Sequence, residues 1–254
     1  MRLGKVCSGR KCRPPSDHAA KKSCYPIGIT GGNAGKEDDS MKKGLTELVF
    51  ILDRSGSMSG LEQDTIGGYN SLLKKQRGEP GEALVTTVLF DDQYELLHDR
   101  IALPGVQPIS EKEYFVRGCT ALLDAIGRTI DKISNAQKHT AQAEKAEKVL
   151  FVITTDGMEN ASREYRSDKI KAMIELQKAE CGWEFLFIGA NIDAVETAGN
   201  FGIAPDRAAN YHADGEGTTL MYEVLAQTVS SARNGAPLTA NWKKELDEDY
   251  RERK

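Results

Sequence analysis

Several features that would place the chain in a membrane, an export route or a disulfide framework are missing from its sequence. No apolar run approaches the roughly 18 residues that cross a bilayer, and the basic N-terminus has no apolar stretch behind it of the kind that marks a secretory signal. The five cysteines are odd in number and are not spaced as a secreted disulfide framework. These absences predict a cytoplasmic protein without a membrane partner.

Common catalytic signatures are missing as well. None of the four histidines lies in an HExxH helix, and no Gly-x-Ser-x-Gly elbow surrounds a serine. No nucleophile and base stand at a spacing that suggests a catalytic pair. The sequence therefore favours a protein that is not an enzyme.

Charge divides the chain into segments. Residues 1–43 carry 10 Lys and Arg against 4 Asp and Glu, whereas the rest of the chain has a net charge of −10. The first segment has no apolar periodicity, so we expect it to be disordered, with Met41 as an alternative start of the protein. We expect one folded domain at 45–235. Residues 236–254, rich in charge, are expected to form a solvated tail.

Three functional interpretations of the N-terminal segment find little support. Residues 30–37 resemble a phosphate-binding loop, but Thr30 replaces the first glycine, Glu37 replaces the final Ser or Thr, and no strand precedes them. A zinc site would lack the close CxxC pairs of zinc modules; its residues would be Cys7, Cys12, His18 and Cys24. The basic segment could bind nucleic acid by charge, but the folded part is acidic, so a nucleic-acid partner is not indicated.

Short apolar runs alternate with helical stripes between residues 45 and 235. Runs at 47–52, 149–153 and 185–188 end in turn residues, which is typical of strands buried in a parallel sheet. Residues 83–90 and 94–103 predict an antiparallel hairpin, and stripes such as Leu122/Ile126/Ile130 predict helices. The pattern predicts an α/β fold: a doubly wound, mostly parallel sheet with one antiparallel edge hairpin and helices on both faces.

Oxygen-bearing side chains follow the predicted central strands. In doubly wound sheets the ligand site lies beyond the carboxyl ends of the strands, and a third loop, 117–120, opens a helix at the same edge. Carboxylates and hydroxyls suit a hard divalent cation, Mg²⁺ above all, with Mn²⁺ or Ca²⁺ as alternatives. The candidate ligands are Asp53, Ser55, Ser57, Thr120 and Asp156. Ser59, followed by Glu62, is instead expected to form a capping box for the first helix.

These residues carry a resemblance to a known family. Asp53-x-Ser55-x-Ser57, then Thr120, then Asp156-Gly157, together with the Gly-x-Thr-Ala-Leu-x-Asp-Ala pattern at 118–125, resemble a von Willebrand factor type A (vWA) domain across about residues 45–233. More closely, the sequence resembles bacterial single-domain proteins of this family, which are partly linked to stress or tellurium-resistance gene sets. Cys119 departs from the pattern, because a small residue such as Gly or Ser is commoner there.

The resemblance implies a Rossmann-like fold and a metal-ion-dependent adhesion site. It implies that Ser55 and Ser57 bind Mg²⁺ directly, that Asp53 and Asp156 hold coordinating waters, and that Thr120 binds directly or through water. A protein partner would then supply an exposed Asp or Glu to the metal. Two alternatives stay open: a phosphotransferase or phosphatase that uses Asp53 as nucleophile, although Ser55 stands where that class has a second Asp, and a metal that only stabilises the loop.

Overall fold

A mixed β-sheet runs through the part of the chain that the structure, a computed structural model, describes, which is residues 41–253. Within these residues the sheet has six strands in the order β3-β2-β1-β4-β5-β6. All neighbours pair in parallel except β2 and β3, which are antiparallel. The strands are β1 (Lys42–Asp53), β2 (Glu82–Phe90), β3 (Tyr94–Ala102), β4 (Ala146–Thr155), β5 (Glu184–Gly189) and β6 (Ala208–Asn210). The predicted sheet and its edge hairpin are confirmed.

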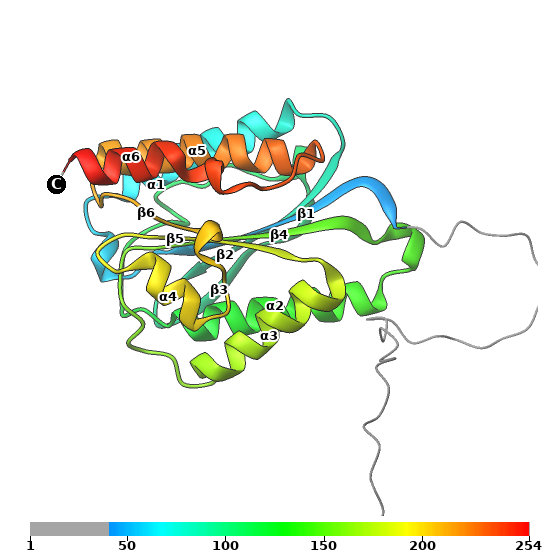
Figure 1. Ribbon diagram of the computed structural model, residues 1–254, viewed down its shortest axis with the longest axis horizontal. Helices are drawn as coiled ribbons and strands as arrows, with labels where there is room; N and C mark the ends of the chain where they lie inside the picture. The colour runs from blue at the N-terminus through cyan, green and yellow to red at the C-terminus, as the bar shows by residue number, and fades with distance from the viewer. Residues whose placement is uncertain (1–40, 254) are drawn as a thin grey trace, which may run out of the picture.

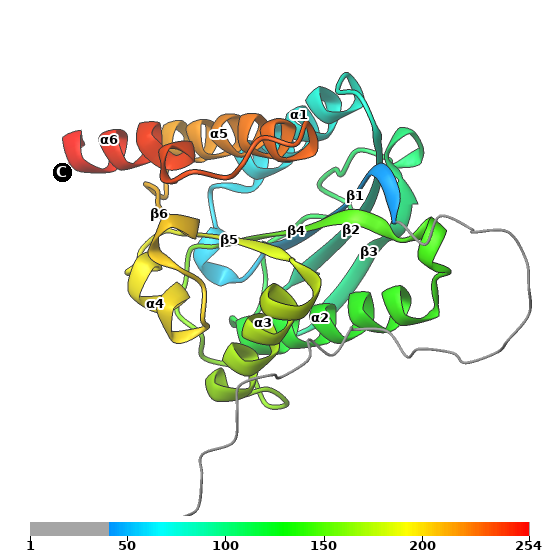
Figure 2. The same ribbon diagram turned by 45° about the vertical axis from the view of Figure 1, so that its right-hand side comes forward.

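Helices cover both faces of this sheet. Figures 1 and 2 show α1, α5 and α6 on one face and α2, α3 and α4 on the other. The helices are α1 (Glu62–Arg77), α2 (Leu122–His139), α3 (Ser167–Cys181), α4 (Ala194–Asn200), α5 (Gly215–Arg233) and α6 (Lys244–Glu252). The doubly wound α/β architecture predicted from the sequence is therefore the observed one.

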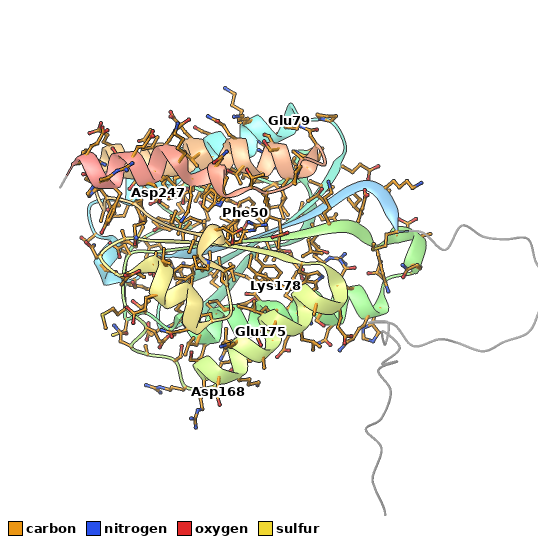
Figure 3. All side chains as sticks on the ribbon, viewed as in Figure 1. Phe50, Glu79, Asp168, Glu175, Lys178 and Asp247 are labelled. Atoms are coloured by element: carbon orange, nitrogen blue, oxygen red, sulfur yellow. The ribbon has the colours of Figure 1, made fainter. Side chains whose placement is uncertain are left out.

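The central strand β1 supplies side chains to two separate cores. Leu48 and Phe50 lie in the core under α1 and α5, whereas Val49 and Ile51 lie in the core above α2 and α3. Successive side chains of a strand point to opposite faces, so a strand covered on both sides is mostly apolar, and the buried Glu47 of β1 is paired with Arg100 over 2.6 Å. Phe50, labelled in Figure 3, packs edge-on against the Tyr69 ring with 5.3 Å between centroids.

Strand register brings two carboxylate-bearing loops together. Leu52 of β1 is paired with Thr154 of β4, so Asp53 and Asp156 leave the sheet at the same edge. On the other side Asp53 is paired with Phe90, the last residue of β2. The carboxyl ends of these three parallel strands therefore place their loops side by side, as the sequence analysis expected.

The expectation of a solvated tail at 236–254 is wrong for the described residues. The tail forms α6, which packs on α5 and β6, and its Leu246 is completely buried in the core. The Trp242 ring nitrogen donates to the Asp206 carbonyl over 2.8 Å. One leucine and one tryptophan are enough to anchor a segment whose other side chains are mostly charged, because each buries a large apolar area.

Two smaller expectations also change. β1 begins at Lys42, so the expected disordered segment of 1–43 overlaps the sheet, while residues 1–40, with their phosphate-loop and zinc hypotheses, lie outside the described residues. Ser59 does not cap α1: the helix begins at Glu62, after a 3₁₀ turn at Gly56–Met58 and a reversal at Gly60, which has φ +91°. None of the helices within 41–253 has the length and apolarity to cross a bilayer.

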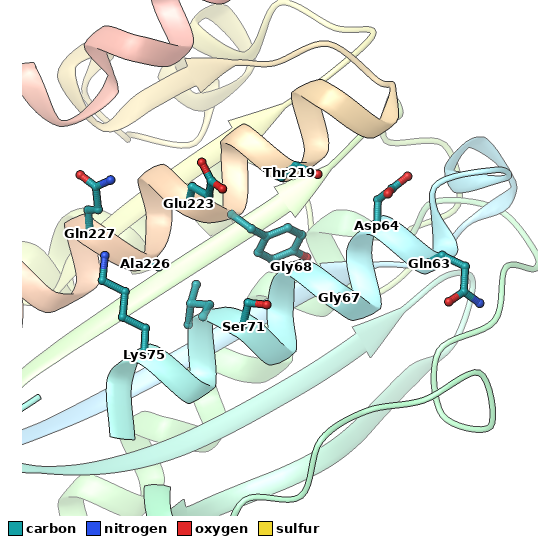
Figure 4. Close-up of a pocket in the computed structure, with 12 residues that line it drawn as sticks. Gln63, Asp64, Gly67, Gly68, Ser71, Lys75, Thr219, Glu223, Ala226 and Gln227 are labelled. Carbon is teal, nitrogen blue, oxygen red and sulfur yellow. The ribbon is translucent and has the colours of Figure 1, made fainter. Parts of the chain in front are cut away.

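A pair of glycines on α1 allows a close helix contact and gives a test of the packing. The helices α1 and α5 border a groove of about 490 Å³, seen in Figure 4. A Cβ at Gly68 would lie 2.3 Å from a ring carbon of Tyr222, whereas a Cβ at Gly67 would meet nothing within 4 Å.

Gly68→Ala should therefore lower the free energy of unfolding by about 1–3 kcal/mol, since α5 has to move. Gly67→Ala, the matched control one residue away, should raise it by about 0.5–1 kcal/mol through helix propensity alone. Urea denaturation measures both. Equal effects of the two substitutions would contradict the close contact between α1 and α5.

Candidate functional site

The loop after β1 is shaped around the Asp53 carboxylate. One carboxylate oxygen, Oδ1, accepts the Ser55 amide over 2.7 Å, and Oδ2 accepts the Thr155 hydroxyl over 2.6 Å. The Tyr114 hydroxyl donates to the Asp53 carbonyl. Asp53 is 1% exposed, so its side chain holds neighbouring residues and has no free oxygen directed to solvent.

Three hydroxyls from the candidate set lie in contact. Thr120 donates its hydroxyl hydrogen to the Ser55 oxygen over 2.9 Å, and the Ser55 and Ser57 oxygens are 3.0 Å apart. Ser55 and Thr120 are buried, whereas Ser57 is exposed, so this oxygen cluster opens to solvent on one side. The two predicted loops that carry hydroxyls are thus brought together.

Asp156 lies buried beside this cluster. It is 1% exposed, and neither of its carboxylate oxygens has a hydrogen-bond partner among residues 41–253. The next residue, Gly157, approaches so closely that a Cβ there would lie 2.9 Å from the Ser57 hydroxyl and 3.3 Å from that of Thr120. A buried carboxylate without a hydrogen-bond partner is costly, and the side chains beside this one are hydroxyls, whose oxygens suit a cation.

The electrostatics of the two carboxylates favour a cation. Burial raises the pKa of Asp53 to about 6; hydrogen bonds from Thr155 and Ser55 oppose the rise, and the nearby negative charge of Asp156 adds to it. Burial likewise raises the pKa of Asp156, and the nearby Ser57 hydroxyl, which lies beyond hydrogen-bond distance of the carboxylate, opposes the rise only in part. A divalent cation at this place would favour the charged form of both groups.

A buried ion pair holds the loop after β1 in place. The Arg54 guanidinium is fully buried and donates to the Asp91 carboxylate over 3.0 Å and to Glu95 over 2.6 Å. Arg117 donates to the same Asp91 oxygen over 2.7 Å. Burial acts to raise the pKa of Asp91, but the hydrogen bonds it accepts, above all from Arg117, hold the pKa below its usual value. Asp91 therefore joins the loops after β1, after β2 and before α2.

The loop after β4 positions Thr120 and the start of α2. The Asn160 side-chain oxygen accepts the Thr120 amide over 2.9 Å, and the Thr120 carbonyl accepts the Asn160 and Ala161 amides. Glu159 accepts the Leu123 amide over 2.9 Å, so it caps α2 from a distant segment.

Sequence reasoning missed several of these positioning residues. They are Arg54, Asp91, Tyr114, Thr155, Glu159 and Asn160. The one available signal was position, since Thr155, Glu159 and Asn160 flank Asp156 in the loop after the same buried strand.

The residues present fit a hard divalent cation. Within 41–253, no group of three or more His, Cys, Asp and Glu could hold a metal ion. The five-residue set combines two carboxylates with three hydroxyls, which is an oxygen-only donor set suited to Mg²⁺ or a similar ion. Cys119, beside Thr120, is exposed, and His98 is buried with its ring nitrogen 2.9 Å from the Thr87 hydroxyl.

Comparison with known proteins identifies the fold. No protein-family model and no curated protein sequence matches the chain. Among solved structures, the vWF domain of the type V pili tip protein Mfa5 from Porphyromonas gingivalis matches 74% of this chain and 95% of its own, with a TM-score of 0.52 and 10% identity. A von Willebrand factor type A protein from Catenulispora acidiphila matches 76% of this chain and 43% of its own, with a TM-score of 0.50 and 11% identity.

A matrix protein from the mussel byssus is a further structural neighbour. Proximal thread matrix protein 1, in a structure whose adhesion-site motif is described as occupied by zinc, matches 76% of this chain with a TM-score of 0.50 and 16% identity. The chain spans less than half of that protein, 47% of its length. At these identities the likeness concerns the fold alone, and the fold is of the vWA type.

The raised pKa of Asp53 gives a test of the site that needs no partner. In EDTA the group contributes stability below the unfolded-state pKa of about 4 and loses it as pH rises through about 6, because the folded protein must then hold a buried charge. Mg²⁺ should raise the melting temperature at about pH 7.5 and have little effect at about pH 5, where a proton occupies the site.

Asp53→Asn serves as the comparison, since it removes the titrating group and keeps its shape. Its melting temperature in EDTA should change less between the two pH values than that of the wild type, measured by differential scanning calorimetry. A wild-type protein whose response to Mg²⁺ is the same at both pH values would contradict this account of Asp53.

Proposed function

We propose that this vWA-type domain is a Mg²⁺-dependent protein-binding module that captures an exposed Asp or Glu of a partner protein. Ser55, Ser57 and Thr120 would hold the ion, with Asp53 and Asp156 balancing its charge. When bound, the ion supplies positive charge and an exchangeable position for the partner carboxylate. By the family resemblance, the setting would be the cytoplasm of a bacterium, in a stress or tellurium-resistance system.

One observation carries the proposal: Asp156 is buried, has no partner in the described residues, and lies against a cluster of three hydroxyls. A neutral hydroxyl set leaves a bound cation with much of its charge, whereas direct carboxylate ligands would neutralise it. Gly56, Ser57, Gly118 and Cys119 are exposed around the cluster, so a partner can approach it from solvent.

The geometry of Asp53 weighs against the phosphotransferase alternative. A nucleophilic carboxylate needs an oxygen free to reach the phosphorus atom. Both Asp53 oxygens are hydrogen-bonded, one to the Ser55 amide and one to the Thr155 hydroxyl, and the side chain is almost fully buried. Asp53 is arranged to position a loop.

Asp156→Asn tests the metal site directly. It keeps the size and shape of the side chain but removes one negative charge, so Mg²⁺ affinity measured by calorimetry should fall about 10–100-fold. Asp168→Asn makes the same charge change at an exposed position on α3 and should leave the affinity unchanged. Ser55→Ala combined with Ser57→Ala should abolish binding.

Unchanged Mg²⁺ affinity in both site variants would refute the assignment. Turnover of a generic aryl phosphate tests the competing enzyme. It should stay near background in the wild type with Mg²⁺. Metal-dependent turnover that disappears in Asp53→Asn would favour the phosphotransferase instead.

A further inference from the structure

Large apolar side chains are exposed next to the candidate metal site. Within residues 41–253, three large hydrophobic residues are exposed: Met158 at 71%, Leu176 at 52% and Phe115 at 42%. Two of them, Phe115 and Met158, follow residues that contact the loop after β1: Tyr114 bonds to Asp53, and Gly157 lies against Ser57. Exposed apolar side chains gathered at a binding site indicate contact with a partner more than singly scattered ones do.

Phe115 is held rigidly at the rim of the loop. Its neighbour Tyr114 donates a hydrogen bond to the Asp53 carbonyl, and the Arg117 amide donates to the Arg54 carbonyl over 3.0 Å. The guanidinium carbons of Arg54 and Arg117 each lie 5.2 Å from the centre of the Phe115 ring. Because these contacts already order the ring, a partner that packs on it loses little conformational entropy.

Met158 stands between two fixed residues on the other loop. Gly157 lies against the Ser57 and Thr120 hydroxyls, and the Glu159 carboxylate is bonded to the Leu123 amide. The backbone is therefore anchored on both sides of an exposed, flexible thioether. Methionine adapts its shape to the side chains that cover it, which suits a surface that contacts a partner.

The charges beside the site favour a partner whose carboxylate is flanked by apolar residues over one with several acidic residues. Asp92 is exposed and lies close to Gly118, where a Cβ would be 2.3 Å from its Oδ1; its charge also acts on the Arg117 guanidinium, which is bonded to Asp91 instead. Arg117, a partly exposed cation beside the Phe115 ring, is paired with Asp91. A partner segment with several acidic residues would meet repulsion, whereas one carboxylate flanked by apolar side chains would not.

We infer that Phe115 and Met158 form an apolar rim that selects the partner. The partner segment is a protein loop or terminus in which a single Asp or Glu has large apolar residues next to it in sequence. The carboxylate reaches the metal site and the apolar neighbours pack on the apolar rim. This inference rests on the proposed function, because the carboxylate anchors the segment.

Two capped peptides test the inference in Mg²⁺ and in EDTA. One carries a single Asp among glycines, and the other carries the same Asp between Leu and Phe. Titration of isotope-labelled full-length protein, followed by NMR, gives both dissociation constants. The wild type should bind the apolar-flanked peptide about tenfold tighter or more, since burial of one large side chain suffices for that.

Phe115→Ser and Met158→Ser should each reduce this preference, and the double variant should bind the two peptides within about twofold of each other. Leu176→Ser removes a side chain whose exposure lies between those of Phe115 and Met158, about 13 Å along α3 from the helix start, and should keep the preference. If Phe115→Ser fails to fold, Met158→Ser decides alone, because its side chain is the most exposed of the three.

The outcomes separate the inference from the proposed function. Equal affinity of the wild type for both peptides in Mg²⁺, or a preference that is undiminished in Met158→Ser, would overturn the apolar rim and leave carboxylate capture intact. Absence of binding of both peptides in Mg²⁺ would overturn carboxylate capture itself. If the apolar-flanked peptide binds as tightly in EDTA as in Mg²⁺, the surface works without the metal, and the inference is overturned.

Discussion

The buried ion pair between Arg54 and Asp91 is the interaction on which the arrangement of the candidate site depends. Neither side chain is exposed, and Asp91 also accepts Arg117 and, through its carbonyl, the Ala121 amide. Removing one member of such a pair leaves an uncompensated charge in the interior, which costs far more than an exposed ion pair contributes. Three loops that are distant in sequence are thereby held at one edge of the sheet.

The sheet and this ion pair position different parts of the site. Parallel pairing of β1 with β4 fixes where Asp53 and Asp156 leave the sheet, while Asp91 fixes the loop that carries Thr120. Asn160 then sets the Thr120 backbone from the remaining side. Sites supported in this way keep their geometry when they are empty, so binding requires little rearrangement.

The buried strands and the edge of the sheet at which the five candidate ligands lie were predictable, because apolar runs mark the strands and the ends of those runs mark the edge. A strand buried on two faces, such as β1, shows as a continuous apolar run, and the polar residue after it marks the functional edge of the sheet. The supporting contacts were not predictable, since Arg54 and Asn160 find partners in loops whose conformation no repeat sets. The prediction of a solvated tail at 236–254 failed for another reason: the segment is mostly charged, and the sequence gives no sign that Leu246 is buried.

The one-sided opening of the hydroxyl cluster has a kinetic consequence. Asp53, Ser55, Thr120 and Asp156 are each at most 3% exposed, and only the Ser57 side faces solvent. In the proposed function, a partner carboxylate would cover the same opening through which the ion enters. Ion and partner would then dissociate in a fixed order, the partner first, so a chelator added to a formed complex would act no faster than the partner leaves.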